Sequence, residues 1–332
     1  MVGLITFTVV MDMVDSSITL TERLWNHMHK RLIQALLLFF CTTTCFAIPR
    51  VAVTIKPVHA LVASVGEGIF EPELLLPDYA SPHTYQLKPS TLKTLQQADM
   101  VIWVGPALEL FMNKPIAQIH PSMGLITLSQ IPGISLLPQR KGRAWQEGHD
   151  HHEHHSANEK DLIDPHLWLS TDNAKVIVNY IATFLSTKDP EHALQYQHNA
   201  KQTIERLDGL KKTLRSMLQD VQTQPFLVYH DGYQYFQEEF HLNGIGTIVL
   251  NPHLPLSAHS LSTVQQLIKT QHVKCVFRET EFSDTMVRNS LNNMGVTVAE
   301  LDPLGARLKS GPDNYDKTLL EIGKTMKECL SK

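Results

Sequence analysis

The sequence of 332 residues predicts an α/β protein with two lobes, each a parallel-type sheet covered by helices, and one long rigid helix that joins them. Two observations predict this architecture. After residue 47, short apolar runs rich in β-branched residues alternate with segments of helical periodicity, which is typical of parallel sheets. Between two such sets lies a long stretch, Pro190 to Val221, whose apolar residues repeat at helical spacing.

The first set of segments forms the N-terminal lobe in this prediction. Val51 to Ile55 is a short β-branched strand, and a helix follows from Val58 to Val65. Ser90 is a candidate cap for a helix that runs through Ala98, and Met100 to Val104 is the next apolar strand. Strands and helices that alternate in this way indicate a parallel sheet at the centre of the lobe.

The second set of segments begins near Pro225 and forms the C-terminal lobe. The strands that we expect there are 226–229, 247–250, 274–277 and 296–301. The helices between them are expected at 233–240, 260–270 and 283–294, and a terminal helix begins near Tyr315. Two similar α/β lobes are the simplest account of both sets.

The segment from Pro190 to Val221 is the expected connection between the lobes. It has no Pro after its first position, and its apolar residues recur at sevenfold spacing, at Ala193, Ala200, Leu207, Leu214 and Val221. A single helix of this length is about 45 Å long. It would run along both lobes and restrain hinge bending between them. The alternative is two shorter helices with a break at Gly209.

The first 47 residues have the features of an export signal. Lys30 and Arg31 precede the apolar run Leu32 to Phe40, which is too short to span a bilayer, and small residues lead to a cleavage site after Ala47. A buried helix is the competing interpretation of the apolar run, but its basic flank favours export. Because Met28 stands where such signals begin, residues 1–27 are a candidate over-extended start.

Export also predicts the state of the cysteines. Cleavage after residue 47 removes Cys41 and Cys45 and leaves Cys275 and Cys329. An even pair of cysteines in an oxidising compartment indicates one disulfide. Closing a loop of this length contributes roughly 4 kcal/mol to stability on the chain-entropy model.

Composition excludes several classes of partner. The chain has 29 Lys and Arg against 33 Asp and Glu, a net charge of -4, and no basic stripe, so we expect no nucleic-acid partner. Hydrophobic residues make up 43% and charged residues 19%, which is typical of a globular protein. We expect a monomer. The 18 histidines are the unusual feature, and they direct attention to metal chemistry.

Four metal-capable side chains lie at the ends of expected strands or in the loops after them: His83, His166, His230 and Asp302. In open α/β sheets ligands bind outside the carboxyl ends of the strands, so residues of both lobes can converge there. Three imidazoles and a carboxylate complete a four-coordinate shell that suits Zn²⁺. Such a shell leaves no open position for a catalytic water, which favours holding a metal over using it.

A second group of histidines lies in one short, low-complexity stretch. Residues 148–155 read Gly-His-Asp-His-His-Glu-His-His, with the imidazoles of His149, His151, His152, His154 and His155. These side chains can hold a divalent ion in many alternative arrangements. We expect an auxiliary site of lower affinity. The competing interpretation is a surface loop with incidental histidines.

Several segments together resemble the ZnuA-type family, the periplasmic zinc-binding proteins of zinc ABC importers. They are 80–90, 98–106, 164–170, 229–236 and 301–305, and the likeness runs from about Val51 to Cys329. The resemblance implies two α/β lobes joined by one long helix, with Zn²⁺ bound between them by His83, His166 and His230. It also implies a periplasmic location, a disulfide between Cys275 and Cys329, and a membrane permease and ATPase as partners.

The resemblance leaves the fourth ligand open. Some zinc-binding members have Glu immediately before the first histidine, where this chain has Pro82. Asp302 matches the position that donates a carboxylate in related manganese and zinc receptors, so either Asp302 or a water completes the shell. In similar manganese receptors the third ligand is Glu, whereas this chain has His230, and imidazole favours Zn²⁺.

The expected function is therefore that of an exported solute-binding protein that captures Zn²⁺ and delivers it to an ABC permease. The expected parts are a signal peptide at 1–47, an N-terminal lobe at 48–189, a linking helix at 190–221 and a C-terminal lobe at 222–332. The alternatives are a manganese or iron receptor, a metal-dependent adhesin and a zinc hydrolase. Against the hydrolase, the sequence has neither an H-E-x-x-H nor a G-x-S-x-G motif. We expect no enzymatic activity.

Overall fold

The computed structural model of the chain describes residue 25 and residues 48–118, 123–145, 162–249, 258–291 and 294–332. The chain divides into two units, 1–47 and 48–332, and nearly all described residues belong to the second unit. The predicted signal segment, apart from residue 25, and the histidine-rich residues 149–155 lie outside the described residues.

The N-terminal lobe is built on a four-stranded parallel sheet with the strand order β2-β1-β3-β4. Its strands are β1 Val51–Val53, β2 Glu73–Leu74, β3 Met100–Trp103 and β4 Gly124–Thr127. Its helices are α2 Lys56–Val65, α3 Pro89–Gln97 and the single turn α4 Asn113–Ile116, with the 3₁₀ turns η1 Leu110–Met112 and η2 Leu128–Gln130. The expected strands β1 and β3 are present, whereas β2 and β4 were not predicted.

One expected helix cap is wrong. Helix α3 begins at Pro89, so Ser90 lies inside its first turn, and Lys88 occupies the cap position with an extended backbone. Proline is favoured at the first helical position because its fixed φ suits the helix and its missing N–H would have no partner there. The start of α3 is therefore set by Pro89.

The C-terminal lobe repeats this arrangement with the strand order β6-β5-β7-β8, again all parallel. Its strands are β5 Phe226–His230, β6 Gly244–Val249, β7 Cys275–Glu279 and β8 Thr297–Leu301. Its helices are α7 Gln234–Phe240, α8 Ala258–Thr270, α9 Asp284–Ser290 and α10 Asn314–Leu330. The alternation predicted for this lobe is confirmed, with boundaries that shift by a few residues.

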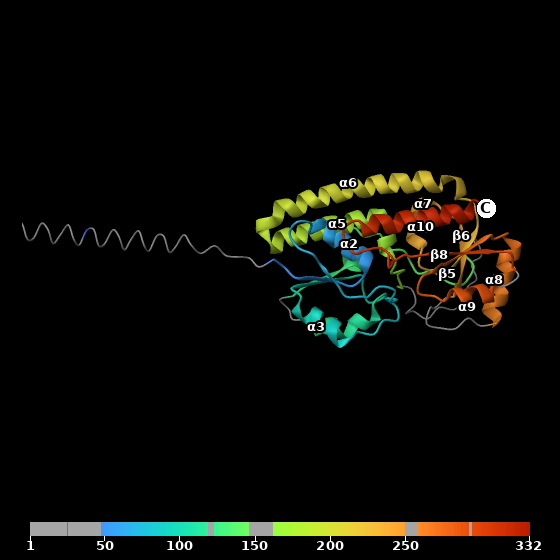
Figure 1. Cartoon of the computed structure of the whole chain (residues 1–332), viewed down its shortest axis with the longest axis horizontal. Helices are drawn as coiled ribbons and strands as arrows, with labels where there is room; N and C mark the ends of the chain where they lie inside the picture. Colours follow the sequence, from blue (N-terminus) through green and yellow to red (C-terminus); the bar gives the residue numbers. More distant parts are fainter. Residues whose placement is uncertain (1–24, 26–47, 119–122, 146–161, 250–257, 292–293) are drawn as a thin grey trace, which may run out of the picture. The chain divides into compact units, whose positions relative to one another are not determined.

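A layer of long helices lies over both sheets (Figure 1). Helix α6 Ala193–Leu218 packs against α5 Thr171–Lys188, α10 and α2. The 3₁₀ turns η4 Pro190–His192 and η5 Gln219–Val221 extend α6 at its two ends, and the helix passes through Gly209 without a break. The alternative of two shorter helices is therefore wrong. Among the described residues, no atom outside the helix's own backbone lies within 4 Å of a Cβ placed on Gly209, so this glycine is on the exposed face of the helix.

The two lobes share one apolar core. Buried side chains from β1 and α2 in the first lobe join those of α5 and α6 and continue to β5, β7 and α10 in the second. Two smaller clusters pack on the outer faces of the two sheets. Because one core crosses from lobe to lobe, the predicted fold of two α/β lobes on a long helix is confirmed as a single packed body.

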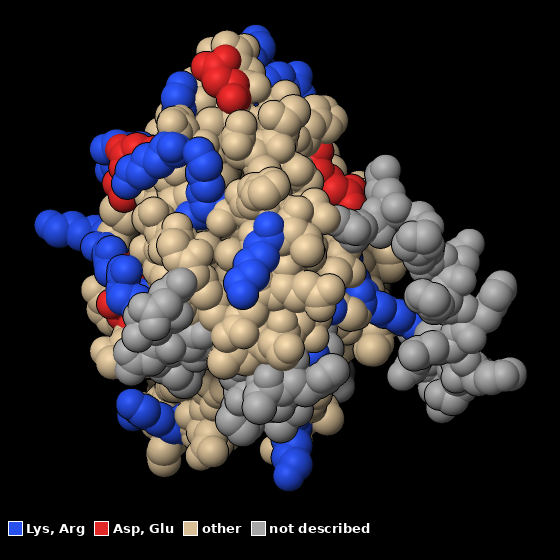
Figure 2. Space-filling view, turned by 90° about the vertical axis from the view of Figure 1, so that its right-hand side faces the viewer, with Lys and Arg blue, Asp and Glu red and all other residues tan. Residues whose placement is uncertain are grey.

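Cys275 at the start of β7 and Cys329 near the end of α10 form the predicted disulfide, with 6.1 Å between their Cα atoms. It fastens the last helix to a central strand of the C-terminal sheet. Over the described residues, every helix is too short or too polar to cross a bilayer. On the face of the molecule in Figure 2, Lys and Arg side chains are scattered over the surface, and some of them adjoin Asp or Glu.

Candidate metal centre

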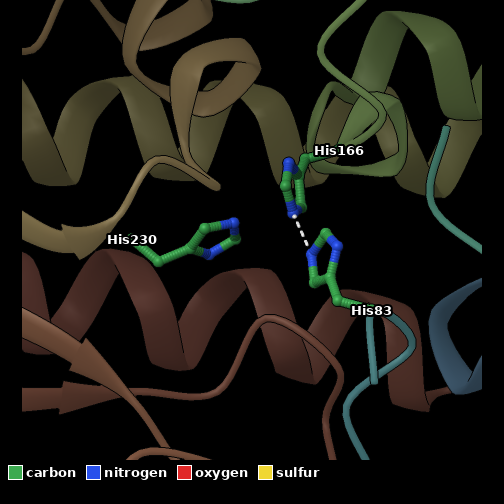
Figure 3. Close-up of side chains that lie close together, drawn as sticks. All are labelled: His83, His166 and His230. Carbon is green, nitrogen blue, oxygen red and sulfur yellow. Dashed lines mark hydrogen bonds between the residues drawn. The ribbon is translucent and has the colours of Figure 1, made fainter. Parts of the chain in front are cut away.

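Three of the predicted ligands converge where the two lobes meet. His83 comes from the loop between β2 and α3, His166 directly precedes the 3₁₀ turn η3 Leu167–Leu169, and His230 is the last residue of β5. One side-chain nitrogen from each of the three lies within 4.8 Å of the other two, and the rings face one another in Figure 3. The structure thus brings together residues that are far apart in the sequence.

The spacing of the nitrogens fits a metal ion. Nε2 of His83 lies 3.3 Å from Nε2 of His166. With Zn–N distances near 2.05 Å, the ligands of a tetrahedral zinc ion are about 3.3 Å apart, so this pair already has the required separation. One of the two facing nitrogens must carry a proton to make their hydrogen bond. A bound cation would take the place of that proton.

His166 is held by a buried carboxylate. Oδ1 of Asp164 accepts hydrogen bonds from the backbone N of His166 at 3.0 Å and from its Nδ1 at 2.7 Å. Because Nδ1 donates to the carboxylate, the neutral ring has its lone pair on Nε2, the atom that faces His83. An acceptor on the far nitrogen is the usual way in which proteins fix a metal-binding histidine.

His230 is fixed by its place in the sheet and by a second buried carboxylate. Strand β5 pairs with β6 on one side and β7 on the other, and Oε1 of Glu279 lies 3.5 Å from Nδ1 of His230. Burial lowers the pKa of His230, but the hydrogen bond and charge of Glu279, together with the charges of Asp231 and Glu281, raise it, and the net pKa lies above the ordinary value of 6.5.

A glycine allows the rings to approach one another. A Cβ placed on Gly232 would lie 3.2 Å from Cε1 and 3.3 Å from Nδ1 of His230, and 3.4 Å from Cδ2 of His166. These distances are at or below ordinary van der Waals contact. The absence of a side chain at this position therefore makes room for both imidazoles.

Asp302 lies outside this set of three close nitrogen atoms. Its Oδ2 accepts a hydrogen bond from the backbone N of Arg307 at 3.1 Å, and the residue lines a separate cavity with Glu300 and Thr318. Among the described residues, the set of mutually close ligand atoms comprises only the three histidines. The role of Asp302 as a fourth ligand stays a prediction. Asp231, the other carboxylate near His230 in sequence, is paired with Arg140 instead.

The acidic side chains that line the histidine pocket are Glu279 and Glu281. Burial and then the charge of Glu279 raise the pKa of Glu281 to about 7. Neither residue was predicted from the sequence, because the expected strand ends at Phe277, whereas β7 continues to Glu279. The pairing of β5 with β7 explains why Glu279 lies at the site. Val228 pairs with Phe277, so two residues further on His230 and Glu279 lie side by side on adjacent strands.

Solved structures with the same fold define a class of protein. A ZnuA crystal structure is 26% identical, with a TM-score of 0.71, over 86% of this chain and 100% of that one. The periplasmic zinc-binding protein TroA from Treponema pallidum has a TM-score of 0.72 over 86% of this chain and all of TroA, at 19% identity, and so shares the fold. The fold is that of two-lobed periplasmic metal receptors.

Sequence comparisons identify the family within this class. The family model described as "ZnuA: Zinc-uptake complex component A periplasmic" matches residues 51–329. The high-affinity zinc uptake system protein ZnuA of Brucella suis is 34% identical over 307 residues, 85% of this chain and 92% of that protein. Its counterpart from Yersinia pestis is 31% identical over 92% of this chain and 99% of that protein. The chain belongs to the ZnuA family, and the resemblance seen in its motifs is confirmed.

Proposed function

We propose that this chain is an exported receptor that binds Zn²⁺ through His83, His166 and His230 and delivers it to the permease and ATPase of a zinc ABC importer. The observation that carries the proposal is the convergence of three imidazole nitrogens from both lobes within 4.8 Å in a member of the ZnuA family. Relatives named high-affinity zinc uptake proteins support the transport role.

The chemistry of the donors supports zinc as the cargo. Three nitrogen ligands match Zn²⁺ better than the harder Mn²⁺, which prefers oxygen. The imidazole of His230 at the third position thus does not favour the manganese alternative. Either Asp302 or a water completes the shell in this proposal. The histidine-rich residues 149–155 act as an auxiliary site that holds further ions weakly.

Ion capture follows from the hydrogen bonds around the rings. Asp164 keeps the lone pair of His166 on Nε2, and Nε2 of His83 lies opposite it. A cation that enters would replace the proton between these nitrogens, and the neutral ring of His83 would then carry its single proton on Nδ1. The facing pair therefore gives an ion two donors at once, and His230 supplies the third.

The test is a competition titration of Zn²⁺ and Mn²⁺ on the chain from residue 48 onward and on the same chain without residues 149–155. We expect one tight Zn²⁺ site in both proteins, weaker sites only in the first, and weaker binding of Mn²⁺. A ZnuA deletion mutant has been solved with zinc bound, at 25% identity to this chain. Loss of the tight site on deletion would refute the assignment of His83, His166 and His230.

A further inference from the structure

Glu279 stands out among the buried groups beside the histidines. It is the last residue of β7 and is only 1% exposed. Neither of its carboxylate oxygens has a hydrogen-bond partner in the part of the chain that the structure describes. An isolated buried carboxylate is costly, because burial removes its hydration without replacing it. This cost calls for a compensating positive group.

The ion-pair partner that the structure gives Glu279 is the ring of His230. Oε1 lies 3.5 Å from Nδ1 of His230, slightly beyond a normal hydrogen bond. On the other side of the pocket, Asp164 makes the same contact to Nδ1 of His166 at 2.7 Å. Each of the two deeply buried histidines thus has a carboxylate behind its far nitrogen.

Glu279 is placed behind His230 and outside the ligand set. The group of ligand atoms within 4.8 Å of one another contains the three histidine nitrogens and no carboxylate oxygen of the described residues. A doubly charged ion held by three neutral imidazoles keeps its charge of +2. Two buried carboxylates, Asp164 and Glu279, supply the matching negative charge one imidazole away.

We propose that Glu279 is a positioning residue for metal binding. It accepts a hydrogen bond from Nδ1 of His230, which leaves Nε2 for the ion, and its charge offsets that of a divalent cation. The inference rests on the proposed zinc-binding function. It assigns to Glu279 opposite effects in two states, because the carboxylate stabilises the loaded site and destabilises the empty one.

Two variants separate charge from hydrogen bonding. Glu279→Gln keeps an acceptor oxygen of the same reach and removes the charge, whereas Glu279→Ala removes both. Loss of an outer partner of a metal ligand costs roughly 10–100-fold in affinity. We expect the loss of Zn²⁺ affinity to be near the low end of this range for Glu279→Gln and near the high end for Glu279→Ala. The measurement is competition with a chelator.

The stability of the metal-free protein distinguishes a positioning role of Glu279 from a role in packing alone. Glu279→Gln removes a buried charge, so the melting temperature of the empty protein stays the same or rises while Zn²⁺ affinity falls. NMR of the loaded protein with ¹⁵N-labelled histidine shows whether the proton on Nδ1 of His230 persists. We expect this proton in the wild type and in Glu279→Gln. In Glu279→Ala we expect it to exchange faster with solvent.

Glu109→Gln is the matched control. Glu109 is another fully buried glutamate, but it accepts hydrogen bonds from the hydroxyl of Thr54 and the backbone N of Gly105, and it is not among the residues that line the histidine pocket. Its Zn²⁺ affinity should equal that of wild type. Unchanged affinity in both Glu279 variants, or a lower melting temperature of the empty Glu279→Gln protein, would overturn the inference alone. Failure of the wild-type chain to bind Zn²⁺ tightly would overturn the proposed function as well.

Discussion

The two lobes have the same strand order yet hold their histidines in different ways. The C-terminal lobe presents His230 from the end of β5, a strand paired on both sides, so the position of this ring is set by the sheet. The N-terminal lobe presents His83 from a loop, and this ring is the more exposed of the two. We infer from this difference that His230, like the buried His166, has a fixed position, whereas the loop that carries His83 is the part of the site that can adapt as the ion enters.

Removing one ligand from each side tests this difference most strongly. We expect His230→Ala to weaken Zn²⁺ binding by at least about 1000-fold, because the sheet leaves no way to replace the lost nitrogen. His83→Ala should cost about 100-fold, since its loop can move and admit a water as ligand. The measurement is a chelator competition for each variant.

His198→Ala is the control for both variants, because His198 is an exposed histidine on α6, outside the site. It should bind Zn²⁺ like wild type. Equal losses in His83→Ala and His230→Ala would remove the distinction between the two sides, and wild-type affinity in His230→Ala would exclude the site.

The disulfide marks a second difference, since it lies in the C-terminal lobe. Replacing both Cys275 and Cys329 by Ser opens a loop of 54 residues. We expect the free energy of unfolding to fall by about 2–5 kcal/mol, measured by urea unfolding. Zn²⁺ affinity should change little, because the bond lies at the start of β7 and His230 at the opposite, carboxyl end of its neighbour. A large loss of affinity would show that the disulfide also sets the geometry of the site.

The N-terminal lobe contains a buried acid with a pH-dependent cost. Burial raises the pKa of Glu109 to about 7 from its ordinary value of 4.5, despite hydrogen bonds from Thr54, Gly105 and Val104. Below pH 4.5 both folded and unfolded chains keep this proton; above it the unfolded chain releases the proton first. This group therefore destabilises the fold by about 3 kcal/mol as pH rises to 7.

Glu109→Gln should remove this dependence. The stability of the variant relative to wild type is expected to improve from pH 4.5 to pH 7, as measured by urea unfolding at several pH values. A difference between the two proteins that stays constant across this range would mean that Glu109 is ionised throughout.

The smallest effect concerns the space between the rings. Gly232→Ala places a methyl group against His230 and His166, and crowding of this kind costs about 1–3 kcal/mol, or roughly tenfold in Zn²⁺ affinity at its lower end. Gly209→Ala is the matched control on α6, where a Cβ meets nothing within 4 Å. It should leave affinity unchanged and stabilise the helix by about 0.5–1 kcal/mol. Unchanged affinity in Gly232→Ala would show that the rings have room to move apart.

The sequence predicted much of the fold because strands and helices have different apolar periods, which remain visible in a single chain. It missed β2, a strand of two residues that is too short for any pattern to register. It also missed α5, although Ser170 caps this helix by accepting a hydrogen bond from the backbone N of Asn173. A strand as short as β2 depends on pairing with a distant strand, and that information is absent from local sequence, whereas the cap and the 18 residues of α5 are local features.

For the candidate site too, local sequence does not reveal which residues of neighbouring strands lie side by side. His230 was predicted because ligands bind at the carboxyl ends of parallel strands. The same reasoning would have predicted Glu279 if the expected strand had extended to the true end of β7. Asp302 comes one residue after Leu301, which pairs with Glu279. Strand β8 ends at Leu301, so the alternation of side chains along the strand does not set the direction of Asp302 as it sets those of His230 and Glu279. Register across the sheet decides which strand ends meet.

The packing of α10 has a consequence for the order in which the chain can fold. This helix, residues 314–330, packs against α2 from the opposite end of the sequence, and the hydroxyl of Tyr315 donates to the backbone oxygen of Trp168. The packing of the N-terminal lobe is therefore incomplete until α10, at the end of the chain, is available. Contacts between such distant segments slow folding, since a long loop must close before they form. We therefore expect the N-terminal lobe to reach its full stability only after the last helix of the chain has been made.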